Sequence, residues 1–88
     1  MNVNERRNAI LGVEFDRYVR EHPAFAARIP RGSQVILQLP NDARFNAWAR
    51  SIAERQREPG QPVVLVNIAR IRPAKSRLVS PKLQIEAA

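Results

Sequence analysis

Few of the side chains that commonly catalyse reactions occur in this 88-residue sequence. His22 is the only histidine, and it stands before Pro23 at the predicted end of a helix. A general base needs a partner that orients it, and the neighbouring Glu21 faces another direction on the helix. We therefore expect the His22 ring to hydrogen-bond a carbonyl group at the end of that helix, without a catalytic role.

The carboxylates and hydroxyls show no pattern of an active site. Most of the eight acidic residues have a basic neighbour at helical spacing, which is typical of a solvated helix surface. No H-x-x-x-H or D-x-D pattern supplies metal ligands, and no serine has the context of a nucleophile elbow. The sequence contains no cysteine for disulfides or thiolate metal sites. It predicts a protein that is not an enzyme and that has no cofactor or metal site.

The segment PGQP, residues 59–62, is a weak candidate for a phosphate-binding loop. Such a loop needs several N–H groups that point inward. This segment has one glycine, and two of its four residues are prolines, which have no N–H. We expect the segment to end a helix and begin a strand.

A cluster of cations near the C-terminus is the strongest candidate for a binding site. The formal charge is +7, and residues 61–88 hold five of the 15 cations with one acid. These cations are Arg70, Arg72, Lys75, Arg77 and Lys82. They can pair with the phosphates of a nucleic acid, but no aromatic residue between them could stack on a base. The favoured interpretation is a solvated loop that balances acids elsewhere or in a partner. Nucleic-acid contact is the alternative.

The sequence predicts two helices. The first covers residues 4–22, with Asn4 as its N-cap, and the next segment, PAFAARIP, adds one further turn. On the helix at residues 4–22, apolar side chains recur at helical spacing and form one face, which consists of Leu11, Phe15, Tyr18 and Val19. The residue before proline is pushed out of the helical region, so Pro23 ends this helix.

The second predicted helix covers residues 42–57 and begins with Asp42 as its cap. Its apolar stripe consists of Phe45, Trp48, Ala49, Ile52, Ala53 and Gln56. The other side of the helix is charged. We expect Trp48→Ala to be the most damaging single change in this helix.

Apolar runs predict the strands. Residues 33–39, SQVILQL, are nearly continuously apolar, which suits a strand covered on both faces. Residues 62–70, PVVLVNIAR, are predicted to form the inner strand. The helix between the two runs is long enough for a right-handed crossover, so we expect parallel strands. Residues 72–81 predict a loop, and KLQIEA at 82–87 predicts an edge strand, because Leu83 and Ile85 alternate with polar residues.

The order α-β-α-β-β predicts a small α/β (α+β) fold, a single domain over residues 1–88, with a short, mainly parallel sheet packed by two helices. No apolar run approaches the roughly 20 residues that span a bilayer. The N-terminus is charged at once, without the apolar block of a signal peptide. These features predict a cytoplasmic protein that does not enter a membrane.

Two stretches, NAILGVEFDRYVREHPAFAARIP and QREPGQPVVLVNIARIRPAKSRL, carry a family resemblance. They resemble a family of small bacterial proteins that is described only as a domain of unknown function, and the resemblance covers most of the chain. It implies a free-standing, small, soluble protein. It implies no activity, cofactor or site residue.

The apolar strands also predict self-association. One helix is expected on each face of the sheet, or both on one face, and the second arrangement leaves apolar side chains bare. Pairing across a two-fold axis would cover them, so we expect a homodimer. Pairing through the exposed edge strand is an alternative route. The leading hypothesis is a protein-interaction module, with itself or another protein as partner. The alternative is a basic, nucleic-acid-associated protein with a regulatory or antitoxin-like role.

Overall fold

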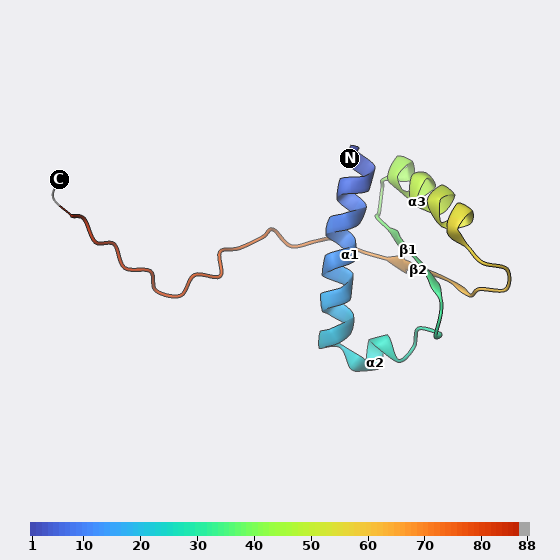
Figure 1. Cartoon of the computed structure of the whole chain (residues 1–88), viewed down its shortest axis with the longest axis horizontal. Coiled ribbons are helices and arrows are strands. Elements are labelled where there is room, and N and C mark those ends of the chain that lie inside the picture. Colours follow the sequence, from blue (N-terminus) through green and yellow to red (C-terminus); the bar gives the residue numbers. More distant parts are fainter. Residues whose placement is uncertain (87–88) are drawn as a thin grey trace.

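The computed structural model of the chain describes residues 1–86. Its elements are α1 (Val3–Glu21), α2 (Pro23–Ala26), β1 (Gln34–Gln38), α3 (Ala43–Gln56) and β2 (Val63–Asn67). Helices and a short two-stranded parallel sheet form a mixed α/β body (Figure 1). The predicted fold class is confirmed, and each helix and strand boundary lies within a few residues of its predicted position.

The first helix begins two residues earlier than expected, because Asn2 rather than Asn4 is its N-cap. The Asn2 Oδ1 atom accepts a hydrogen bond of 2.8 Å from the backbone N–H of Glu5, and the Asn2 amide donates to the Glu5 carboxylate. This exchange between the N-cap and the third helical residue resembles a capping box. The following α2 starts at Pro23, which is compatible with a first-turn position.

Asp42 caps α3 as predicted: its Oδ1 atom accepts from the backbone N–H of Phe45 at 3.1 Å. The buried residues of α3 fall on the predicted apolar stripe, at Phe45, Ala49 and Ala53. Phe45 has no exposed surface, whereas Trp48 is only half-buried. Phe45 is therefore the side chain in this helix whose loss should cost the most stability, and the expectation for Trp48 needs this correction.

The two strands pair in parallel, with Gln34 opposite Val63 and Gln38 opposite Asn67. The parallel arrangement is confirmed. The sheet within residues 1–86 has only these two strands, so the prediction that β2 is an inner strand is wrong. The predicted edge strand is wrong too: residues 82–86 have no regular structure, and Ala87 lies outside the described residues. Alternation alone forms no strand where the chain offers no neighbour for the backbone.

The core lies between α1, β1 and α3. Its buried residues are Leu11, Ile36, Leu37, Phe45, Ala49 and Ala53. Residues 68–86, called the arm below, leave the end of β2 as an extended segment without regular structure, in agreement with the loop predicted for 72–81. The arm projects from the body (Figure 1) and gives the molecule a longest extent of 66 Å against 32 and 23 Å.

Candidate functional site

His22 occupies the structural position that the sequence predicts. Its Nδ1 atom lies 2.9 Å from the carbonyl oxygen of Tyr18, and the two rings stack with centroids 3.9 Å apart. A carbonyl oxygen can only accept, so this bond places the ring proton on Nδ1. The ring therefore closes the end of α1 and takes part in an aromatic cluster.

The acidic residues near α3 also have structural partners. Asp42 caps the helix and forms an ion pair with Arg7 of α1. The Arg7 guanidinium lies 5.7 Å from the centroid of the Phe45 ring. This arrangement joins the starts of α1 and α3 over the core. Within residues 1–86, no group of three or more histidine, cysteine or carboxylate side chains is placed to hold a metal ion.

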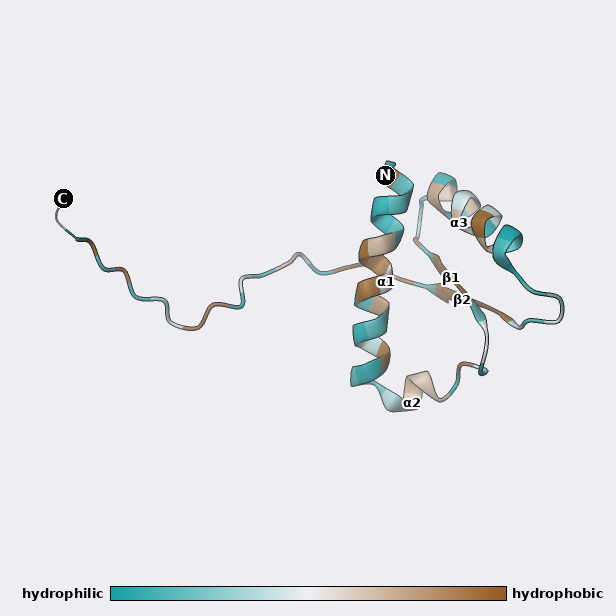
Figure 2. Ribbon diagram, viewed as in Figure 1, coloured by the Kyte–Doolittle hydropathy of each residue, from teal (hydrophilic) through white to brown (hydrophobic). Residues whose placement is uncertain are grey.

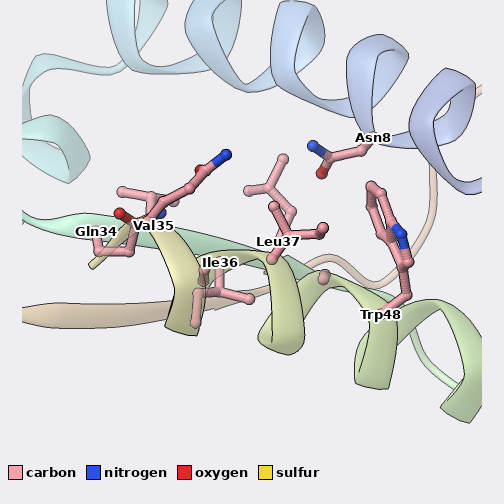
Figure 3. Close-up of a pocket in the computed structure, with 10 residues that line it drawn as sticks. Asn8, Gln34, Val35, Ile36, Leu37 and Trp48 are labelled. Atoms are coloured by element: carbon pink, nitrogen blue, oxygen red, sulfur yellow. The ribbon is translucent and has the colours of Figure 1, made fainter.

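A small cavity lies beside β1. Its volume is about 70 Å³, and it is lined by Asn8, Gln34, Val35, Ile36, Leu37, Trp48, Ala49, Ile52, Ala53 and Gln56. Figure 3 shows that Asn8 comes from α1, Trp48 from α3, and Ile36 and Leu37 from β1. Small-molecule sites usually enclose roughly 300–1,000 Å³. We interpret this cavity as a gap in the packing at the rim of the core.

The sheet has two free edges. Two backbone hydrogen bonds between β1 and the residues that flank β2 show which N–H and C=O groups point toward the partner strand and which point toward an edge. Gln34 N–H donates to the Pro62 carbonyl at 2.7 Å, and Ile68 N–H donates to the Gln38 carbonyl at 2.9 Å. Backbone groups in a parallel ladder point toward the partner at every second residue. The N–H and C=O groups of Val63, Leu65 and Asn67 therefore point away from β1, along the free edge of β2.

The free edge of β1 is partly closed by α3. The Asn46 side chain accepts a 2.8 Å hydrogen bond from the N–H of Leu39 and donates one of 2.8 Å to the Leu39 carbonyl. The amide thus acts as a substitute for a neighbouring strand just beyond the end of β1. Such covering is one way in which proteins protect a sheet edge from unwanted pairing. No side chain of residues 1–86 forms an equivalent hydrogen-bonded pair on the outer edge of β2 in this structure.

Beside β2 lies a groove of about 350 Å³. It is lined by Phe25, Arg28, Ile29, Val64, Leu65, Val66 and Asn67. Four successive residues of a strand alternate between its two faces, so a groove that touches all four runs along the strand edge. The Phe25 ring makes edge-to-face contacts with two rings of α1. Its centroid lies 5.2 Å from that of Tyr18 and 6.4 Å from that of Phe15. Apolar side chains therefore form most of the groove, Arg28 and Asn67 are its polar members, and α1 supports the wall that contains Phe25.

One face of β2 is also uncovered. The register places Leu65 opposite Ile36 and on the same face of the sheet. Ile36 is 7% exposed beneath α3, whereas Leu65 is 41% exposed and Val63 is 43% exposed. Within residues 1–86, the backbone of β2 comes close to β1 and to no helix. The candidate site is therefore β2 with its groove, its bare face and its free edge.

The predicted basic residues do not gather on a folded surface. Arg70, Arg72, Lys75, Arg77 and Lys82 are all exposed and are spread along the arm. None of them takes part in an ion pair of the described residues. Apolar residues stand between and after them, and Figure 2 shows brown, apolar segments alternating with hydrophilic ones along the arm. Leu78, Val79, Leu83 and Ile85 are between 75% and 89% exposed.

The fold and the candidate site describe a small α/β domain with an open strand edge and an extended basic arm. The chain belongs to the family of unknown function DUF5647, whose model matches residues 3–81. This match confirms the resemblance to a domain of unknown function. The comparison with curated proteins gave no match, and neither did the comparison with solved structures. Within residues 1–86, no helix combines the length and the apolar character needed to cross a membrane.

Proposed function

We propose that this protein is a non-enzymatic interaction module that associates with itself through β2. The observation that carries the proposal is the difference in burial between the paired residues Ile36 and Leu65. A strand with an open edge and an uncovered apolar face invites pairing with another chain. A two-fold pairing would cover the same surface in both copies.

The energy for assembly at this surface would come from apolar burial and from new backbone hydrogen bonds. Burying a valine or leucine side chain completely contributes about 1.5–3 kcal/mol relative to leaving it exposed, and Val63 and Leu65 are each less than half exposed now. In a two-fold dimer, each of these contacts occurs once in each copy and therefore contributes twice. Added ladder hydrogen bonds contribute about 0.5–1.5 kcal/mol each. Micromolar association is a reasonable expectation once the entropy cost of assembly is included.

Light scattering coupled to size exclusion tests this proposal on the whole chain. We expect a dimer mass at tens of micromolar and a monomer for Leu65→Lys, since the ammonium group would be buried in the interface. Val13→Lys is the matched control, because Val13 lies on the outer side of α1 and is 57% exposed. The control should stay dimeric. A wild-type mass of one chain that does not change on concentration would contradict the proposal.

A second candidate function is nucleic-acid binding through the arm, and the exposure of its five unpaired cations favours it. Arg72→Ala combined with Arg77→Ala should lower the slope of log affinity against log salt by about 2 if both contact phosphates. Arg44→Ala combined with Arg50→Ala, two exposed positions on α3, is the control of equal charge. The absence of binding at low salt to both duplex and single strands would exclude this function.

A further inference from the structure

We propose that the groove beside β2 receives the C-terminal arm of a second copy, with Lys82–Glu86 added as a third strand. This inference rests on the proposed self-association and specifies how it occurs. The two copies would exchange arms, so that each arm completes the sheet of the other. The structural observations that support it are the free edge, the shape and charge of the groove, and the state of the arm.

The arm segment has the pattern of a strand that lacks a neighbour. In KLQIE, residues 82–86, Leu83 and Ile85 point to one side of an extended chain, and polar side chains point to the other. Leu83 is 89% exposed and Ile85 is 85% exposed. Placed in the groove, these two side chains would contact Phe25 and Ile29. The backbone of the segment would meet the outward N–H and C=O groups of β2, which is the mode of recognition by strand addition.

Charge favours the same placement. Arg28 is the only charged residue in the lining of the groove, and it takes part in neither of the ion pairs of residues 1–86. Glu86 is the only acidic residue of the arm, and it directly follows Ile85. A docked arm would place Glu86 at the end of the added strand, where its flexible side chain can reach Arg28. Lys82, at the other end of that strand, would point away from the groove together with Gln84. The other four cations of the arm precede the docked segment.

The reach of the arm favours a second copy over its own body. Residues 68–86 leave the end of β2 and continue away from the body, as Figure 1 shows. An extended chain covers about 3.3 Å per residue, or ~60 Å over the arm, which exceeds the two shorter extents of the molecule, 32 and 23 Å. To fill its own groove the arm would have to reverse direction, and it contains no hairpin in this structure. Exchange across a two-fold axis satisfies both copies.

The first experiment removes the apolar contacts of the arm at exposed positions, where folding should not be affected. Leu83→Ser combined with Ile85→Ser should raise the dimer dissociation constant roughly a hundredfold, since two buried aliphatic contacts are lost per arm. Leu78→Ser combined with Val79→Ser removes similar side chains from the same arm and should leave the constant unchanged. If the first variant remains as dimeric as the wild type while Leu65→Lys is monomeric, self-association stands and arm exchange is wrong.

Amide hydrogen exchange gives a readout at the groove itself. In the wild-type dimer, the N–H groups of Leu65 and Asn67 should be protected by the docked arm. In the Leu83→Ser, Ile85→Ser variant they should exchange quickly, whereas Val64 and Val66 should stay protected, because their N–H groups point toward β1. Fast exchange at Leu65 in the wild-type dimer would overturn the proposal.

A mixing experiment separates exchange between copies from folding back within one copy. Arg28→Glu alone and Glu86→Arg alone each place like charges together at both grooves, and each should weaken the homodimer by about tenfold. When the two variants are mixed, both groove–arm contacts of the heterodimer pair opposite charges. We expect a heterodimer that is tighter than either homodimer. A mixture that forms no heterodimer, with groove protection retained in monomers, would show that the arm folds onto its own sheet and would overturn the proposal.

Discussion

The two strands of this protein have similar sequences and very different surroundings. β1 reads QVILQ and β2 reads VVLVN, and they are hydrogen-bonded to one another. The last three residues of β1 are buried, whereas β2 alternates between exposed and half-buried. α3 covers β1, and Asn46 closes part of its outer edge. The comparison teaches that apolar sequence marks a strand that needs cover without showing whether its own chain provides it.

The largest effect should come from the contact that α3 makes with the core beside β1. Phe45→Ala should lower the free energy of unfolding by about 3–5 kcal/mol, because it removes a completely buried ring. Trp48→Ala should cost less, since part of that ring remains in water. Urea unfolding measures both, and Phe45→Leu is the milder variant if the alanine form does not fold. A greater loss for Trp48→Ala would show that side-chain packing at the rim contributes more stability than the buried ring of Phe45.

A direct comparison of the strands uses the register partners Ile36 and Leu65. Ile36→Ala should cost about 2–5 kcal/mol at any protein concentration. Leu65→Ala should cost less than about 1 kcal/mol in dilute solution, where the monomer dominates. The cost at Leu65 should grow with protein concentration, because assembly stabilises the folded state by mass action. Equal costs at both positions in dilute solution would mean that β2 is covered within one chain.

The protection of the β1 edge can be removed at one side chain. Asn46→Ala should cost about 1–3 kcal/mol, since the part-buried N–H and C=O of Leu39 lose their partners. Arg50→Ala, on the exposed side of the same helix, is the control. We also expect assemblies larger than a dimer, since a second edge becomes available for pairing. Light scattering checks this, and a variant that stays dimeric would show that α1 or α3 still blocks the edge.

A modest effect should come from the start of α3, where Asp42 helps to hold the helix over β1. Asp42→Ala should cost about 0.5–2 kcal/mol through loss of the N-cap. Asp42→Asn retains a capping oxygen and loses the ion pair with Arg7, so it should cost at most about 1 kcal/mol. Thermal and urea unfolding of the two variants measure the stability lost in each, and thereby separate the contribution of the N-cap from that of the ion pair. A similar loss for both would assign most of the stabilisation to the contact with Arg7.

Much of the body could be predicted from local sequence. Helix positions follow from apolar spacing, Asp42 and Pro23 mark boundaries, and the crossover helix between two apolar runs requires them to be parallel. The His22 bond to Tyr18 follows from its place at a helix end. The candidate site could not be predicted in the same way. The groove joins Phe25 and Ile29 to β2 residues more than 30 positions away in the chain, and no local pattern brings them together.

The sequence by itself determined the helices, the two paired strands, the order of these elements, and the segregation of cations into the last part of the chain. Those properties depend on neighbours within a few residues, through capping, periodicity and proline geometry. Only the tertiary structure decided that β1 is covered and β2 is not, that Asn46 closes one edge, and that the alternating segment KLQIE stays unpaired. The physical reason is that a strand is completed by backbone groups from elsewhere. Whether such groups are within reach depends on how all the elements pack.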